Sequence, residues 1–183
     1  MRRFLICLVT LPFLLSWDCR SAAPPVSVSN QPVTAGDRQP MKPLSEMNWT
    51  DADQRVQKLA DLNGKAVILD FWATYCPPCR EEIPHLNSLL VKYGADNLHI
   101  VGLNVGGAED MPRIPDFVKN TKIDYPIAFP EDELTRFVFA TRSDIPQTAV
   151  FDRRGKMIAK IVGFSPAIQK ELDAAVEKAV GTE

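Results

Sequence analysis

Two apolar runs and a helical stretch between them dominate the middle of the chain. Residues 66–72 and 98–105 are short apolar runs rich in β-branched and aromatic side chains, which is typical of strands buried on both faces. Between them, apolar residues recur at helical spacing over residues 79–93, and Gly94 ends the pattern. This order of strand, helix and strand predicts a βαβ unit, in which the two strands are parallel.

The second half of the chain predicts a hairpin and a terminal helix. Residues 148–152 and 157–162 have the pattern of strands and are separated by Arg153-Arg154-Gly155, so we expect them to pair antiparallel. The last helix is expected after Ser165, a favourable N-cap, with Pro166 in the first helical position.

Shorter elements complete the predicted fold. Helices are expected over residues 116–122 and 131–139, with a short strand over residues 125–129 between them. Before the first central strand the pattern is weaker: it tightens from about residue 44 and leads into a turn at Asn63-Gly64. The chain is therefore predicted to be an α/β protein, with a central mixed β-sheet flanked by helices.

The N-terminal part has the composition of a leader and a linker. A basic start, an apolar stretch and small residues at positions 21–23 predict a secretory signal peptide over residues 1–23. An uncleaved anchor is the alternative, but the apolar stretch is shorter than the ~20 residues that span a bilayer. Residues 24–43 are rich in proline and polar residues and predict a flexible linker, which leaves residues 44–183 for the folded domain.

The four cysteines fall into two groups. Cys7 and Cys19 would leave with the signal peptide, so that a cleaved chain keeps Cys76 and Cys79. The alternative is lipidation of Cys19, which would tether the N-terminus to a membrane, although Trp17-Asp18 before it is unfavourable for that processing. A pair so close in sequence closes too short a loop to stabilise an exported protein, so we expect it to act chemically.

Charge and composition exclude some partners. The net charge is -2, and acidic and basic residues are mixed along the chain without a long run of either sign. Neither nucleic-acid binding nor a polybasic membrane patch is therefore indicated. A protein partner or a small thiol fits better.

Cys76 lies where the predicted strand leads into the predicted helix. The unpaired N–H groups and the dipole of a helix N-terminus favour a thiolate at that position. Cys79 follows one helical turn later, where it can resolve a mixed disulfide formed by Cys76. The alternative is half of a zinc site, but the spacing of His85 and His99 from the cysteines matches no common zinc pattern. We expect no metal and no cofactor besides the redox-active pair.

Two segments of the chain resemble the thioredoxin family. The run Asp70-Phe-Trp-Ala-Thr-Tyr-Cys-Pro-Pro-Cys-Arg-Glu-Glu-Ile-Pro84 resembles the active-site segment of thioredoxins, most closely that of the exported TlpA-like and ResA-like branch. Pro84 matches the proline that kinks the helix in thioredoxins. Residues 144–152 resemble the cis-proline segment of the family, which implies a cis bond between Ile145 and Pro146.

The resemblance covers about residues 45–180, and residues 106–126 resemble the helix and strand that this branch inserts centrally. It implies a thioredoxin fold with that insertion and an exported or periplasmic thiol-disulfide oxidoreductase. Members of the branch reduce protein disulfides in cytochrome c maturation or oxidase assembly. A disulfide-containing protein substrate and a membrane thiol-disulfide electron donor are the partners that it implies.

The resemblance also assigns roles to residues around the cysteines. Asp70 matches the interior acid of thioredoxins, and burial should raise its pKa so that it acts as a base for Cys79. Glu82 matches an acid that ResA-like proteins place near their pair; the alternative is an ordinary solvated helix residue.

Four residues are expected to bind substrate. A cis Pro146 would bring the backbone of Ile145 beside Cys76, where it can pair with a substrate strand. Trp72 and Tyr75 flank the cysteines and are expected to form an apolar rim, with Tyr75 in place of the tryptophan usual in the family.

The sequence also predicts the direction of electron flow. Pro77 and Pro78 have no N–H to stabilise a Cys76 thiolate, and no histidine stands between the cysteines, so we predict a moderately high Cys76 pKa and a reducing protein. The alternatives are a disulfide oxidant or isomerase, or a metallochaperone that holds Cu(I) through Cys76 and Cys79. A peroxiredoxin is disfavoured because its Pro-x-x-x-Thr-x-x-Cys pattern is absent.

Overall fold

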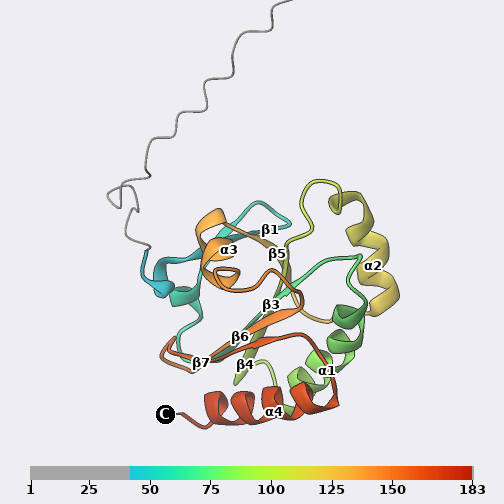
Figure 1. Ribbon diagram of the computed structural model, residues 1–183. Coiled ribbons are helices and arrows are strands. Elements are labelled where there is room, and N and C mark those ends of the chain that lie inside the picture. The colour runs from blue at the N-terminus through green and yellow to red at the C-terminus, as the bar shows by residue number, and fades with distance from the viewer. Residues whose placement is uncertain (1–41, 183) are drawn as a thin grey trace, which may run out of the picture. The chain divides into compact units, whose positions relative to one another are not determined.

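The computed structural model describes residues 42–182, so the predicted signal peptide and most of the predicted linker lie outside the described residues. The described residues form a seven-stranded sheet with helices on both faces (Figure 1). Its strand order is β2-β1-β5-β4-β3-β6-β7. Neighbouring strands are parallel for β3 with β4 and for β4 with β5, and antiparallel elsewhere. The predicted α/β class with a mixed sheet is confirmed.

The centre of the sheet contains the elements with the strongest sequence patterns. Strands β3 (Ala66–Trp72) and β4 (Leu98–Asn104) are parallel and are joined by helix α1 (Pro77–Tyr93), which confirms the βαβ unit. All seven residues of β3 are buried. On its other side β3 pairs with β6 (Gln147–Phe151), which forms the predicted antiparallel hairpin with β7 (Met157–Val162).

The sequence patterns do not predict the hairpin at the other side of the sheet. Strands β1 (Asn48–Asp51) and β2 (Val56–Lys58) pair with each other, and β1 also pairs with β5 (Ile127–Pro130). The buried and half-buried residues of β1 alternate over four positions only, and Val56 is exposed. Such a short pattern gives little signal, and the pairing with β5, far away in the sequence, determines these strands.

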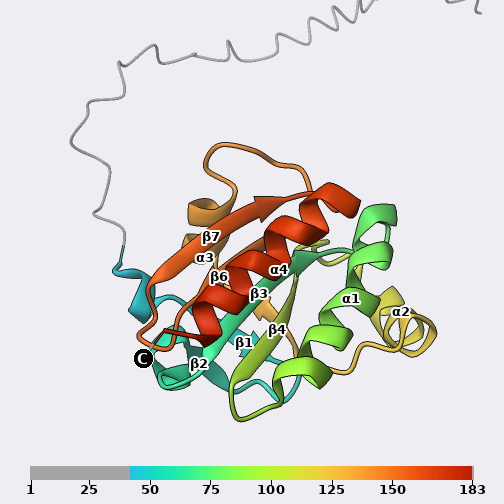
Figure 2. The ribbon, with the colours of Figure 1, turned by 90° about the horizontal axis from the view of Figure 1, so that it is seen from below.

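Helices cover both faces of the sheet. Helices α1 and α4 (Pro166–Val180) pack on one face, as Figure 2 shows, and α3 (Asp132–Val138) packs on the other. Helix α2 (Ile114–Thr121) contacts α1. The hydroxyl oxygen of Ser165 accepts a hydrogen bond from the backbone N–H of Ile168 at 3.3 Å, which confirms the predicted N-cap of α4.

Among the described residues, short 3-10 helices lie before β1 (Leu44–Glu46), after β2 (Leu59–Leu62) and before α2 (Met111–Arg113). Within residues 42–182, no helix is long and apolar enough to cross a membrane.

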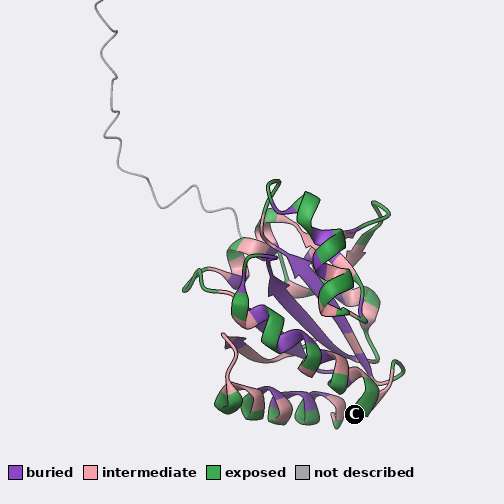
Figure 3. Ribbon diagram, turned by 90° about the vertical axis from the view of Figure 1, so that its right-hand side faces the viewer, coloured by how far each residue is buried: buried purple, intermediate pink, exposed green. Residues whose placement is uncertain are grey.

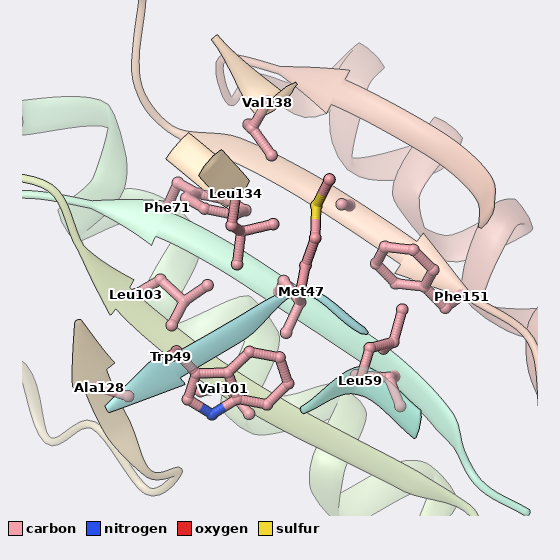
Figure 4. Close-up of a cluster of buried hydrophobic side chains, with 13 residues drawn as sticks. Met47, Trp49, Leu59, Phe71, Val101, Leu103, Ala128, Leu134, Val138 and Phe151 are labelled. Atoms are coloured by element: carbon pink, nitrogen blue, oxygen red, sulfur yellow. The ribbon is translucent and has the colours of Figure 1, made fainter. Parts of the chain in front are cut away.

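The sheet separates two hydrophobic layers, and Figure 3 shows the buried strands between them. Side chains of a strand alternate between its faces, so Leu69 and Phe71 of β3 face the α3 side, in the same cluster as Trp49. Figure 4 shows Phe71 and Trp49 in this cluster. Ile68 faces the side of α1 and α4. The same alternation directs Asp70, two residues further on, into the layer beneath α1, where a carboxylate needs a specific reason to be present.

Candidate active site

The chain passes from strand to helix at the two cysteines. Cys76 is the N-cap of α1, and Pro77 and Pro78 occupy the first two helical positions. Because proline has no N–H, the first N–H of the helix belongs to Cys79, and it donates to the Cys76 sulfur at 3.2 Å. The two cysteines form a disulfide and are 3% and 1% exposed. Little of either cysteine is therefore open to a partner in the disulfide form.

Side chains on two sides fix the loop that precedes Cys76. The Asp110 carboxylate accepts hydrogen bonds from the backbone N–H of Thr74 at 3.0 Å, from its hydroxyl group, and from the side-chain amide of Asn104 at 2.8 Å. The Arg80 guanidinium donates to the Thr74 carbonyl oxygen at 2.8 Å. Burial disfavours the charged form of Asp110, but the hydrogen bonds from Asn104 and Thr74 outweigh it, and the pKa of Asp110 is lowered. Every polar group of Thr74 thus has a partner.

Asp70 lies inside the sheet, as predicted, and is 1% exposed. Its Oδ2 accepts a hydrogen bond from the Tyr125 hydroxyl at 3.1 Å, whereas Oδ1 has no partner among the described residues. Burial raises the pKa of Asp70 to about 7, because water no longer stabilises the carboxylate, and the Tyr125 hydrogen bond opposes the rise. The predicted rise in pKa therefore has the predicted cause.

Glu82 is also buried, at 1% exposure, so it is not the solvated helix residue of the alternative reading. Its Oε1 accepts a hydrogen bond at 2.7 Å from the hydroxyl of Thr148, which lies directly opposite Asp70 in the β3–β6 pairing. Burial raises the pKa of Glu82 well above its ordinary value, the charge of Asp70 raises it further, and the Thr148 hydrogen bond opposes both. At neutral pH we expect the two carboxyl groups to retain a proton between them.

The approach of Tyr125 to Asp70 depends on a glycine. Gly102 of β4 lies opposite Asp70 in the β3–β4 pairing, and a Cβ there would lie 2.9 Å from both the Tyr125 ring and the Trp72 indole nitrogen. We expect Gly102→Ala to displace these rings and to lower the free energy of unfolding by about 1–3 kcal/mol, as measured by chemical denaturation. An unchanged denaturation midpoint would show that the rings can move aside without cost.

The exposed rim contains Tyr75 and Ile145 but not Trp72. Tyr75 is 59% exposed, and Ile145 is half-buried against the apolar cluster that includes both cysteines. The peptide bond between Ile145 and Pro146 is cis, as the resemblance implied. Trp72 is fully buried because its indole stacks on Phe117 of α2, with ring centroids 4.9 Å apart. The expected rim position of Trp72 is therefore corrected: it supports the site from within.

Two grooves meet at Tyr75. The first, which we call the cis-proline groove, has a volume of about 300 Å³. Besides Tyr75 it is lined by Val105, Thr135, Phe139, Ser143 and Ile145. The second, which we call the α1–α2 groove, has a volume of about 400 Å³. Its lining includes Thr74, Arg80, Arg113, Phe117 and Asn120. One groove beside the cysteines is thus largely apolar and the other carries two arginines.

The two histidines lie apart from the cysteine pair. His85 Nε2 is 2.9 Å from a carboxylate oxygen of Asp173 on α4. His99 is half-buried in β4, and burial lowers its pKa. In the part of the chain that the structure describes, no group of three or more His, Cys, Asp or Glu residues is arranged to hold a metal ion.

Sequence reasoning did not identify three polar residues of the site: Asp110, Tyr125 and Thr148. Thr148 carried a signal, because it lies two residues after the cis-proline, in the strand expected beside the active site. Asp110 follows Gly106-Gly107 just after a buried strand, where polar side chains often gather in parallel sheets. Nothing local to Tyr125 indicates its hydrogen bond with Asp70, since the sheet brings the two together.

Comparisons with known proteins find relatives of this chain. A profile of the AhpC/TSA family matches residues 40–160. The thiol-disulfide oxidoreductase ResA of Bacillus cereus is 33% identical over 123 residues, which are 67% of this chain and 69% of that protein.

Two solved structures from Chlorobium tepidum share the fold. One, described as a thiol:disulfide interchange protein DsbE, has a TM-score of 0.65 and 27% identity and covers 78% of this chain and 99% of its own. The other, a thiol:disulfide interchange protein of the thioredoxin family, has a TM-score of 0.62 and 28% identity, with coverages of 78% and 100%. The predicted thioredoxin fold is confirmed.

Proposed function

Because the chain belongs to the AhpC/TSA family and has a Cys76–Cys79 pair at the start of α1, we propose that it is an exported thiol-disulfide oxidoreductase that reduces disulfide bonds in other proteins. The enzyme class is the one that its ResA relatives carry in their name. The observation that carries the proposal is the Cys76 sulfur at the helix N-terminus, 3.2 Å from the N–H of Cys79. Such a position favours a nucleophilic thiolate with its resolving thiol beside it.

The reaction consists of two exchange steps. In the reduced protein the Cys76 thiolate attacks one sulfur of the substrate disulfide, the substrate S–S bond breaks, and the released thiolate takes up a proton. Cys79 then gives its proton to Asp70, in the buried acid pair with Glu82, and attacks the Cys76 sulfur of the mixed disulfide. The second substrate thiolate leaves and is protonated. Two electrons have passed to the substrate, and the protein holds the Cys76–Cys79 disulfide.

We assign substrate docking to the cis-proline groove and its edge. We expect the backbone of Ile145, next to the cis Pro146, to pair with an extended substrate segment, as peptides do when they add to exposed backbone. Tyr75 and Phe139 give the groove apolar walls for a side chain next to the substrate cysteine. This binding mode requires that the substrate be extended around its disulfide, but it requires no particular amino-acid sequence there.

The structure supports a reducing direction of electron flow. A weakly stabilised thiolate makes a reductant, and among the described residues the N–H of Cys79 is the hydrogen-bond donor that reaches the Cys76 sulfur. Equilibration of the protein with glutathione buffers measures its reduction potential. We expect a value closer to that of thioredoxin, about -270 mV, than to that of DsbA, about -120 mV. A potential near that of DsbA would contradict the reductase and favour the disulfide oxidant or isomerase.

A matched pair of variants tests the reason for this potential. An N-cap side chain accepts a hydrogen bond from the N–H of the second or third helical residue. Residue 78 is the second, so Pro78→Ala restores a donor that can reach the Cys76 sulfur. We expect this variant to raise the potential by about 30 mV, equivalent to one hydrogen bond to a charged group. Pro77→Ala restores an N–H at the first helical position, where it does not point at the cap, and should change the potential less. Equal shifts would show that the missing N–H is not the cause.

The physiological setting that we propose is disulfide reduction outside the cytoplasm, in cytochrome c maturation or oxidase assembly. The leader-like composition of residues 1–23 and the similarity to ResA support it. A membrane thiol-disulfide protein would then return two electrons to Cys76 and Cys79 after each cycle. Deletion of the gene should leave the haem-binding cysteines of exported cytochromes oxidised, which alkylation of free thiols detects.

A further inference from the structure

The α1–α2 groove has no role in the reaction described above. It begins at Tyr75, the residue before Cys76, and extends towards Arg113 at the start of α2. It therefore lies on a different side of Tyr75 from the cis-proline groove, with which it shares that residue alone. Because both linings include Tyr75, the residue before Cys76, we expect a substrate segment bound at Cys76 to reach both grooves.

The two arginines of the groove differ in their contacts, and the charge of Arg113 also contributes to the lowered pKa of Asp110. Arg80 is held in place, because its guanidinium donates to the Thr74 carbonyl oxygen at 2.8 Å and lies 5.2 Å from the centre of the Phe117 ring. Arg113 is exposed. Within residues 42–182 neither arginine forms an ion pair. The nearby Asp110 uses both of its carboxylate oxygens to bind Thr74 and Asn104.

The charge of the groove is opposite to that of the chain, whose net charge is -2. Arginine binds a carboxylate through two parallel hydrogen bonds, and the rings of Tyr75 and Phe117 exclude part of the water that would screen the charges. We propose that the α1–α2 groove is a substrate subsite that binds the carboxylate of an aspartate or glutamate close to the disulfide of the partner protein. This inference rests on the proposed reductase function and adds a sequence preference to it.

The test uses short cystine peptides in which one glutamate is moved along the residues flanking the disulfide, each paired with the glutamine version. We expect kcat/KM for reduction to be about 5-fold higher for glutamate at one or two adjacent positions, which corresponds to a good partly exposed ion pair. Arg113→Gln should bring this ratio close to one, and Arg113→Glu should transfer the preference to a lysine peptide. Because each variant is judged by the ratio of kcat/KM for the glutamate and glutamine peptides, a general loss of activity cancels.

Arg154→Gln is the matched control. Arg154 is an exposed arginine in the β6–β7 turn, at the end of β3 away from the cysteines, so its removal changes the net charge equally without altering the groove. The control should keep the 5-fold ratio, and its loss there would assign the preference to net charge and overturn the subsite. Equal reduction of glutamate and glutamine peptides at every position would also overturn it, while leaving the reductase intact. Reduction of neither peptide would instead overturn the proposed function itself.

Discussion

Replacing Cys76 by serine should lower disulfide reduction to the uncatalysed rate, whereas Cys79→Ala should stop the reaction at a covalent intermediate. A serine hydroxyl does not ionise near neutral pH, so the N–H of Cys79 and the helix N-terminus have no anion to stabilise. Loss of a nucleophile that acts as a unit with its neighbours typically costs several orders of magnitude in rate. Insulin reduction, followed by precipitation of the freed chains, measures the loss.

The Cys79→Ala variant provides the complementary result. It keeps the attacking sulfur and removes the one that resolves the mixed disulfide, so partner proteins should remain bonded to Cys76 and separate on adding reductant. The double variant Cys76→Ser/Cys79→Ala is the control and should trap nothing. Retention of disulfide exchange by Cys76→Ser would refute the mechanism. Tight Cu(I) binding by a protein that leaves insulin intact would instead favour the metallochaperone.

Asp70→Asn should make the oxidised protein markedly more stable at pH 8 and leave it almost unchanged at pH 4. The pKa of Asp70 is about 7 in the folded protein, against 3.8 for the free side chain. The unfolded chain therefore releases its proton first as the pH rises, so this group lowers stability progressively between about pH 4 and pH 7. Three pKa units correspond to about 4 kcal/mol, and the asparagine removes this cost.

Urea denaturation of the disulfide form at several pH values measures this effect, since the cysteines do not titrate in that form. Asp124→Asn, which removes an exposed carboxylate next to Tyr125, is the control and should shift stability by less than about 0.5 kcal/mol at any pH. Because the charge of Asp70 also raises the pKa of Glu82, the difference between wild type and Asp70→Asn includes that coupling. A difference independent of pH would mean that folding does not shift the pKa of Asp70, and would contradict the effect of its burial.

The same substitution should slow turnover. If Asp70 accepts the proton of Cys79, asparagine keeps the shape of the side chain but cannot act as the base. Release of the substrate should then slow by about 10- to 100-fold. Attack by Cys76 should keep its rate, because it precedes the proton transfer. Rapid mixing that follows the mixed disulfide separates the two steps.

The parts of the fold that could be predicted are those whose burial is set by their own sequence. β3 is buried along its whole length, and α1 presents one apolar face, so local patterns are sufficient to identify both. β1 could not be predicted in the same way, because its strand conformation depends on pairing with β5 about eighty positions later. The resemblance supplied the thioredoxin fold, but its inserted segment gave no information on how this hairpin would extend the sheet.

In the candidate site, too, local sequence predicted some features, and contacts between distant elements determined the others. The positions of Cys76 and Cys79 follow from a strand that leads into a helix, and the local sequence pattern predicts both elements. Whether Glu82 is solvated or buried depends on how α1 lies against β6, since Thr148 is its partner there. The burial of Trp72 likewise depends on Phe117, which belongs to a helix more than forty residues later. Contacts between elements far apart in the sequence thus determine the burial of both Glu82 and Trp72, which the local sequence pattern does not indicate.

The anchoring of Thr74 by Asp110 from within and by Arg80 from outside involves neither sulfur atom. These hydrogen bonds do not require the disulfide, so we expect them to persist when the two sulfurs are reduced. We expect the loop before Cys76 to change its backbone little between the two redox states. We therefore expect the rate of each exchange to depend mainly on sulfur chemistry and on the approach of the partner.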